Sequence, residues 1–336
     1  MPVRFASPNT ERPNLSMPNA YTHASSVPSS ILNALVQPTG GSEQATFPRN
    51  FIPDAPDRVY SVHGGYGDVY KGTYNGTAVA VKVMRGHGTP HDTEKQKQHF
   101  RHEIPAWRQL SHPNVLPIFD LGDTFDVAIT PAIISPWMKN GNVQDYLRCN
   151  PNTDRLKLIL GIALGLEYLH SKNVVHGDLH TRNILVNDHG MAVVADFGHS
   201  LMRIETYGEL DFATDGLCHI RHMAPELVAG ETQHPSDKSD VYSFASVSFE
   251  ILSGLHPFSN FGSSVDIILA LYEGILPFDR PKEPLFSHSG LDQAIWELMT
   301  LCWNGVPDDR PSMTHSHNVL VKLQAGNSPS GILARL

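Results

Sequence analysis

The sequence predicts an α+β fold with two lobes, a small lobe built on an antiparallel β-sheet and a larger lobe that is mainly helical. From Phe51 the chain has short β-rich runs broken by glycine, and Val79, Val81 and Val83 alternate with Ala80 and Lys82. From Lys139 onward helical patterns dominate. Two stretches, 154–170 and 241–252, are apolar on nearly every face, so we expect buried helices there.

The first 50 residues form a segment of different character, rich in Pro, Asn, Ser and Thr and with little helical or strand period. Such a composition buries too little apolar surface to offset the entropy of ordering. We expect residues 1–50 to be a disordered tail. The alternative is a docking or phosphorylation segment, which Ser7-Pro8 and the serines from Ser26 to Ser30 suggest.

The small lobe is expected over residues 51–135, with one main helix from Asp92 or Thr93 to Leu110. Pro105 lies inside this helix. An interior proline removes a backbone donor and costs about 3 kcal/mol in a regular helix, so we expect a kink just after Glu103. A linker over 136–141, a large lobe over 142–325 and a short C-terminal tail over 326–336 complete the predicted order.

Composition excludes several classes of function. The formal charge is −9 with a pI near 6.1, and Lys and Arg form no dominant block, so a nucleic-acid partner is not expected. The three cysteines, Cys149, Cys218 and Cys302, are widely spaced, which suits a reduced cytoplasmic setting. A long apolar run and a signal-like N-terminus are both missing, so neither a membrane partner nor secretion is expected. The histidine pairs have no third ligand at metal spacing, so no zinc site is expected.

One run of polar residues points to a specific chemistry. Asp178 and Asn183 lie five residues apart in the sequence HGDLHTRN, and Asp196 follows within Asp-Phe-Gly. Metal-assisted phosphoryl transfer needs one carboxylate to orient the attacking hydroxyl and two further oxygen ligands to hold Mg²⁺ on the triphosphate. Asp178, Asn183 and Asp196 fit these needs in that order.

Six further motifs stand on either side of this run, and with HGDLHTRN and Asp-Phe-Gly they make eight in a fixed order. Eight ordered motifs make a family assignment specific. Upstream and downstream they are GGYGDV at 64–69, VAVK at 79–82, Glu103, APE at 224–226, SDVYSF at 239–244, and Cys302-Trp303 followed by Arg310-Pro311. From about Val59 to about Leu323 the chain resembles the eukaryotic protein kinases, and it is most similar to the tyrosine-kinase-like group of serine/threonine kinases.

The resemblance implies a nucleotide site for ATP between the lobes. The backbone of the glycine-rich loop covers the phosphates, Lys82 contacts them and is held by Glu103, and the linker binds the adenine. The loop departs from the family pattern because Val62 replaces its first glycine, and Ser135 is a small gatekeeper residue. The residues implied in nucleotide binding are Gly64, Gly65, Gly67, Val69, Ala80, Lys82, Pro136 and Met138.

The resemblance also implies an enzyme that uses ATP and Mg²⁺ to phosphorylate protein substrates. Asp178, Lys82 and Glu103 are then the catalytic residues, and Asn183 and Asp196 are the metal ligands. Serine and threonine are the expected acceptors, with tyrosine or dual specificity as the alternative. No motif specifies an oligomeric state.

Three departures from the family pattern affect acceptor and regulation. Gly177 replaces the arginine that pairs with a phosphorylated activation loop, while His180 and His219 replace the lysine and threonine that brace the base and the acceptor hydroxyl. Together with Val62 and the kink expected at Pro105, they motivate a second hypothesis, a pseudokinase that binds ATP or acts as a scaffold with little transfer activity. A small-molecule kinase is disfavoured because the APE segment and Arg310 resemble substrate-lobe features of protein kinases.

The remaining matches are structural. By resemblance, Glu226 and Arg310 form a buried ion pair, and Asp240 holds the backbone of the catalytic loop from the start of a buried helix. Three hydroxyls between Asp196 and Glu226 are candidate phosphorylation sites, namely Thr206, Tyr207 and Thr214.

Overall fold

The computed structural model describes residues 51–54, 67–84, 107–121, 132–197, 220–232, 234–279 and 293–325. The predicted tails at 1–50 and 326–336 lie outside these ranges, and so does most of the predicted small-lobe helix with Glu103 and Pro105. Among the described residues, no helix is both long and apolar enough to cross a membrane.

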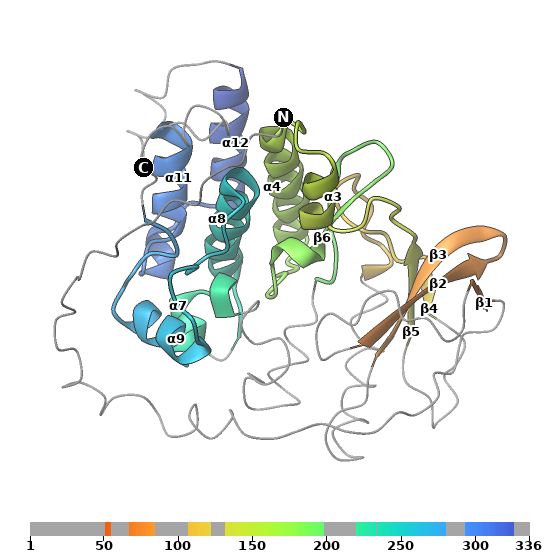
Figure 1. The fold of residues 1–336 in the computed structure, drawn as a ribbon, viewed down its shortest axis with the longest axis horizontal. Helices are drawn as coiled ribbons and strands as arrows, with labels where there is room; N and C mark the ends of the chain where they lie inside the picture. The colour runs from red at the N-terminus through yellow and green to blue at the C-terminus, as the bar shows by residue number, and fades with distance from the viewer. Residues whose placement is uncertain are drawn as a thin grey trace, which may run out of the picture.

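An antiparallel sheet of five strands forms one end of the molecule (Figure 1). The strands run in the order β1-β2-β3-β5-β4, and their bounds are β1 Phe51–Pro53, β2 Gly67–Tyr74, β3 Thr77–Met84, β4 Asp120–Leu121 and β5 Ala132–Pro136. In β3 the side chains of Val79, Val81 and Val83 are buried, while Ala80 and Lys82 are half-buried on the opposite face. The predicted alternation of this strand is therefore confirmed.

Helices make up most of the other end of the molecule (Figure 1), next to a small two-stranded sheet. The small sheet pairs β6 (Ile184–Val186) with β7 (Ala192–Val194). The helices are α3 Val143–Cys149, α4 Arg155–Ser171, α7 Pro225–Val228, α8 Asp237–Ser253, α9 Ser264–Tyr272, α11 Gln293–Cys302 and α12 Met313–Gln324, with the short 3₁₀ turns η1 Thr181–Asn183 and η2 Pro307–Asp309. The α+β fold with a β-sheet lobe and a helical lobe is confirmed.

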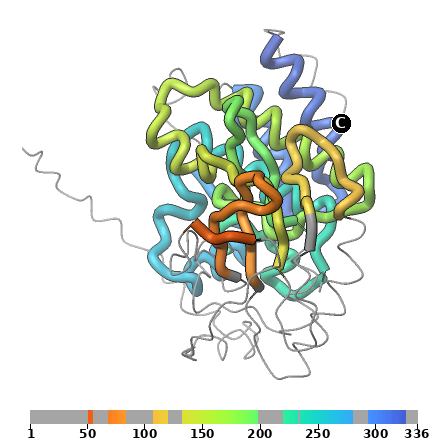
Figure 2. The backbone as a smooth tube through the Cα atoms, turned by 90° about the vertical axis from the view of Figure 1, so that its right-hand side faces the viewer, coloured from red at the N-terminus to blue at the C-terminus, as the bar shows by residue number. Residues whose placement is uncertain are grey.

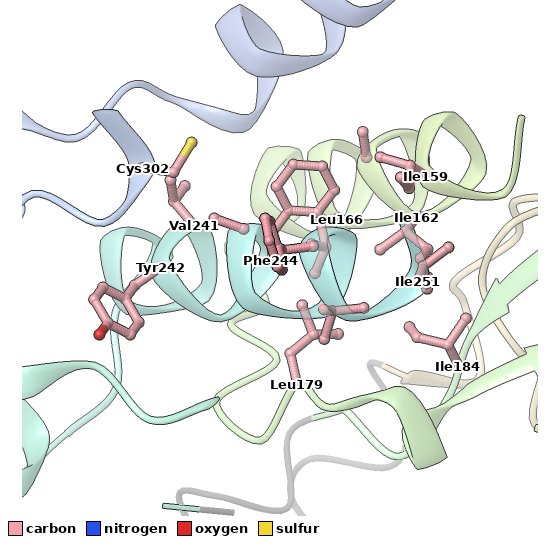
Figure 3. Close-up of a cluster of buried hydrophobic side chains, with 14 of the residues drawn as sticks. Ile159, Ile162, Leu166, Leu179, Ile184, Val241, Tyr242, Phe244, Ile251 and Cys302 are labelled. Atoms are coloured by element: carbon pink, nitrogen blue, oxygen red, sulfur yellow. The ribbon is translucent and has the colours of Figure 1, made fainter. Parts of the chain in front are cut away.

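The two buried helices predicted from the sequence are α4 and α8. Each begins at a polar cap: the Asp154 side chain accepts from the amide of Lys157, and Ser236 forms a reciprocal capping box with Ser239. Figure 3 shows their apolar side chains meeting in one core, with Leu166 of α4 beside Phe244 of α8. This core supports the segment that carries Asp178, because the neighbouring residue Leu179 packs into it.

A second contact joins the segment before β4 to α4 and β7. The Asn114 side chain donates to the carbonyl of Ala192 at 2.8 Å, and its own carbonyl accepts from the amide of Val194 at 2.8 Å. A Cβ at Gly165 would lie 2.6 Å from the Asn114 carbonyl oxygen, so only glycine permits α4 to approach this closely. The end of β7, and with it Asp196, is thus fixed against the helical core.

Viewed at right angles, the backbone shows the five-stranded sheet in front of the helices (Figure 2). The segment after β5 leads from the sheet to α3, whose N-cap is Asn142. Between them the amide of Gly141 donates to the carbonyl of Met138 at 3.1 Å, which closes a turn next to the end of the sheet.

Candidate active site

One face of the sheet presents the small and polar side chains that the sequence assigns to the nucleotide. Val69 of β2 is paired with Lys82 of β3, and Ala80 of β3 is paired with Ser135 of β5. Directly opposite residues of antiparallel strands project from the same face. Val69, Ala80, Lys82 and Ser135 therefore form one continuous surface, at whose edge β5 ends with Pro136.

Lys82 carries the charge on this surface. Its ammonium nitrogen lies 3.0 Å from a carboxylate oxygen of Asp196, a residue that directly follows β7 and Ala195. The Lys82 side chain is 15% exposed and that of Asp196 is 37% exposed, so the pair opens to solvent on the side of the carboxylate. The VAVK and Asp-Phe-Gly motifs, whose Lys82 and Asp196 are 114 positions apart in the sequence, therefore meet at this ion pair.

The backbone of Asp196 adopts a conformation that is unusual for a residue with a side chain. Its φ angle is +59°, in the left-handed region that costs about 1–2 kcal/mol for most residues. Strain of this kind persists only where the surroundings enforce it, and it is often found at functional sites. Here the preceding residue is held, because the amide of Ala195 donates to the carbonyl of Asn183 at 2.9 Å.

Asp178 and Asn183 are tied to each other and to the same strand end. The side-chain amide of Asn183 donates to the carbonyl of Asp178 at 2.9 Å. Because a carbonyl accepts only from the NH₂ group, this bond fixes the orientation of the Asn183 amide and leaves its oxygen on the other side. The Asn183 side chain is buried, so its position is well defined.

His176 connects the same two segments from inside the core. It is fully buried, its Nδ1 accepts from the amide of Asp178 at 3.2 Å, and its Nε2 lies 3.0 Å from the carbonyl of Ala195. A nitrogen that accepts carries no proton and one that meets a carbonyl must donate, so the ring is the neutral Nε2–H tautomer. His176 thereby sets the distance between the residues before Asp196 and those around Asp178.

The helix α8 anchors this loop through Asp240. The carboxylate is 1% exposed and accepts from the amides of His176 at 2.7 Å and Gly177 at 2.8 Å. It also lies 2.8 Å from Nε2 of His170 at the end of α4. A buried carboxylate is costly unless its lone pairs are satisfied, and these three partners satisfy it.

Gly177 takes up a left-handed backbone with φ of +74° between His176 and Asp178. Glycine adopts this conformation without strain, whereas a side chain there would be strained. Gly177, which departs from the family pattern, therefore avoids backbone strain in this loop. It has no side chain that could bind a phosphorylated segment.

The loop continues into His180, which is buried and caps the 3₁₀ turn η1: its Nδ1 accepts from the amide of Arg182 at 3.2 Å. Nδ1 therefore carries no proton. The ring centroid of His180 also lies 6.3 Å from that of His222. A neutral imidazole thus stands two residues after Asp178.

A buried acidic side chain lies behind His222, and sequence reasoning missed it. Glu250 of α8 is 2.7 Å from Nε2 of His222 and 2.6 Å from Nδ1 of His256. Burial by itself would raise the pKa of Glu250, but the hydrogen bonds and charges of the two histidines lower that pKa to about 2. The signal in the sequence was a glutamate in the middle of an apolar helix, a residue type that is seldom buried without a partner.

The ion pair predicted between Glu226 and Arg310 is present. The guanidinium group donates to both carboxylate oxygens at 2.8 and 2.7 Å, and both side chains are almost fully buried. Arg310 also donates to the carbonyls of Asn304 and Lys238, so it ties α7 to α8 and the 3₁₀ turn η2. This pair has a structural role, because it stabilises the packing of α7 against α8 in the helical lobe.

The structure brings together Lys82, Ala80, Val69, Asp178, Asn183 and Asp196, and it places Pro136 and Met138 where the sheet ends. Gly67 begins β2. The other predicted residues lie outside the described ranges, namely Val62, Gly64, Gly65, Glu103, His219 and the candidate phosphorylation sites Thr206, Tyr207 and Thr214.

The oxygen atoms in this site fit a hard divalent cation. Mg²⁺ in proteins is bound by one or two protein oxygens together with substrate phosphates, and it needs no cage of protein ligands. The side-chain oxygen of Asn183, freed by the bond from its NH₂ group to Asp178, and the partly exposed carboxylate of Asp196 supply such oxygens. Among the described residues there is no cluster of three or more His, Cys, Asp or Glu side chains that could hold a metal alone.

A family model described as protein tyrosine and serine/threonine kinase matches residues 62–320, so the chain belongs to the protein kinase family. It is similar to serine/threonine-protein kinase STY17 of Arabidopsis thaliana, with 30% identity over 268 residues that cover 77% of this chain and 43% of the relative. It is also similar to serine/threonine/tyrosine-protein kinase HT1 of the same plant, with 32% identity over 77% of this chain and 64% of the relative.

A third relative is dual specificity protein kinase pyk3 of Dictyostelium discoideum, with 29% identity over 79% of this chain and 18% of the relative. The chain spans less than two thirds of the length of each of these three relatives. The names of these relatives describe a serine/threonine kinase, a serine/threonine/tyrosine kinase and a dual specificity kinase. They agree with the resemblance to the tyrosine-kinase-like group.

Proposed function

We propose that the protein is an ATP-dependent protein kinase that transfers the γ-phosphate of Mg-ATP to serine or threonine hydroxyls of protein substrates. The observation that carries the proposal is the ion pair of 3.0 Å between Lys82 on the sheet and Asp196 after β7. It joins the nucleotide surface to the strand end on which Asn183 and Asp178 are held. Phosphoryl transfer depends mostly on such positioning of charges.

On the nucleotide side, Lys82 is proposed to bind the α- and β-phosphates with Glu103 as its further partner. The backbone of Gly64, Gly65 and Gly67 is proposed to cover the phosphates, and the adenine is proposed to lie between Val69 and Ala80 and the linker residues Pro136 and Met138. The small buried side chain of Ser135 supports this proposal, because it leaves room beside Ala80.

On the acceptor side, Asp178 is proposed to orient the attacking hydroxyl and to receive its proton. The acceptor oxygen forms a bond to the γ-phosphorus while the bond from that phosphorus to the bridging oxygen breaks, which leaves ADP. A bound Mg²⁺, held by Asn183 and Asp196, would neutralise charge on the phosphates. The half-buried position of Asp178 suits a base that must meet an external hydroxyl.

The relatives support the proposed acceptor class, because their names all include serine/threonine or dual specificity. The proposal includes a cytoplasmic location, supported by the absence of paired cysteine spacing in the sequence. Gly177 and His180 favour the alternative, a pseudokinase, because neither residue can supply the charge that the family pattern has there.

The purified protein should be incubated with Mg-ATP and dephosphorylated casein, beside a Lys82→Met variant, and the phosphorylated residues identified by mass spectrometry. Phosphoserine or phosphothreonine with the wild type alone supports the proposal. Phosphotyrosine alone would refute the proposed acceptor class. Equal incorporation with both proteins would instead support the pseudokinase.

A further inference from the structure

A cluster of side chains beside the catalytic loop has no role in the chemistry above. The carboxylate of Glu250 binds His222 through one oxygen and both His256 and Gln144 through the other, at 2.7, 2.6 and 2.5 Å. The partners come from three different parts of the chain: α3, the residues before α7, and the turn after α8. We call these four residues the Glu250 cluster.

The cluster is buried at one end and exposed at the other. His222 is 3% exposed and the Glu250 side chain 4%, whereas the His256 side chain is 65% exposed. An ionised carboxylate in such a position is costly, and apolar residues of similar volume are often at least as stabilising. Three hydrogen-bond partners satisfy this carboxylate, and one of them, His256, connects it to the surface.

The buried end of the cluster faces the catalytic loop. His222 lies next to His180, with a centroid separation of 6.3 Å and an interplanar angle of 49°. Nδ1 of His180 also accepts from the amide of Arg182. The ring that stands two residues after Asp178 is thus next to both η1 and a histidine that is hydrogen-bonded to Glu250.

We propose that the Glu250 cluster positions His180 on the acceptor side of the catalytic loop, and that the protonation of His256 controls how firmly it does so. The proposal rests on the proposed function, since it concerns acceptor binding by the same site. His222, Glu250 and His256 act here as positioning residues, because they reach the acceptor through His180.

The electrostatics around His256 agree with this coupling. The hydrogen bond from Glu250 is the largest effect and raises the pKa of His256, while burial and the charges of Arg221 and Arg182 lower it, and the net direction is upward. Among the described residues, the charged groups that act on His256 are Glu250 of α8, Arg182 of the catalytic loop and Arg221 before α7. His180 faces the cluster at its other histidine, His222. The hydrogen bond between His256 and Glu250 is strongest when His256 is protonated, and it weakens as the pH rises through the pKa of His256.

Steady-state kinetics with dephosphorylated casein and ATP should be measured from about pH 6 to about pH 9, a range that spans the ordinary histidine pKa. At the low end, His256→Gln should raise the KM for casein by about threefold to tenfold, as expected for one charge-assisted bond from an exposed side chain to a buried carboxylate. The KM for ATP should not change. At the high end the variant and the wild type should have the same KM for casein.

His317→Gln is the matched control, because His317 pairs with Glu167 at 3.0 Å and joins α12 to α4 away from the catalytic loop. It should behave as the wild type at every pH. The proposal is overturned if His256→Gln keeps the pH profile of the wild type, if the change falls on the KM for ATP, or if His317→Gln shows the same change.

A second measurement does not depend on transfer activity, so it separates this proposal from the proposed function. In protein labelled with ¹³C at the histidine ring, the signals of His222 and His180 should shift as His256 titrates, and these shifts should vanish in His256→Gln. Signals that stay constant while His256 titrates would overturn the proposal, even in a protein without transfer activity.

Discussion

The carboxylate of Asp240 gives a direct test of how α8 supports the active site. It accepts from the amides of His176 at 2.7 Å and Gly177 at 2.8 Å, and it is 1% exposed. Asp240→Asn preserves the shape of the side chain but replaces one acceptor oxygen with a donor. One of the two amides must then lose its acceptor.

The cost can be worked from these contacts. An unsatisfied buried donor costs about 1–3 kcal/mol, and the bonds that remain lose the charge that makes them roughly twice as strong as neutral ones. We expect the free energy of unfolding to fall by about 3 kcal/mol, which corresponds to a decrease in Tm of about 6–12 °C at about 2–4 °C per kcal/mol. Because the amides flank Asp178, kcat should also fall by at least about tenfold.

Urea unfolding and steady-state kinetics on the same preparation measure both effects. Asp237→Asn is the matched control, because Asp237 is exposed in the first turn of the same helix, and its effect on stability should stay within about 0.5 kcal/mol. The reasoning would be refuted if Asp240→Asn were as stable as Asp237→Asn, or if it had the kcat of the wild type.

Three further predictions concern stability. Glu226→Gln should lower the free energy of unfolding by about 3–5 kcal/mol, since it leaves the buried Arg310 charge unpaired, and a loss below about 1 kcal/mol in urea unfolding would contradict this. The folded pKa of Glu250 is about 2 against an ordinary 4.5, so its stabilisation is complete above pH 4.5 and is lost as the pH falls toward 2; Glu250→Gln should weaken the acid dependence seen by urea unfolding, and an unchanged dependence would argue against it. Gly177→Ala should cost about 1–2 kcal/mol because φ is +74°, whereas Gly177→Asn should cost less, and equal thermal stability of both variants with the wild type would count against a strained position.

The local features of the fold were predictable because they repeat at short range. The period of two in Val79–Val83 placed Lys82 on the less buried face of β3, and the stretch at 154–170, apolar on nearly every face, became α4 with Asp154 as its cap. Glu226 and Arg310 were paired from a family resemblance that assigns both positions. In the first two cases one segment was sufficient, whereas the ion pair needed two motifs whose partnership the family resemblance supplies.

The contacts that were missed join segments far apart in the chain. Glu250 meets His222 at a separation of 28 residues and Gln144 at a separation of 106, and no period within α8 indicates either partner. The tautomers of His176 and His180 depend likewise on which backbone groups the loop presents to each ring nitrogen. Such contacts depend on tertiary packing, which composition and spacing do not encode.

Phosphate transfer by Asp178→Asn tests the central claim most directly, because the claim assigns the nucleotide to Lys82 and Asp196 and the acceptor to Asp178. Transfer from Mg-ATP to casein and the affinity for ATP should be measured on the same samples of wild type and variant. We predict that the variant loses at least about 100-fold in kcat, as for removal of a general base, and binds ATP as the wild type does. Equal kcat in both proteins would contradict the account.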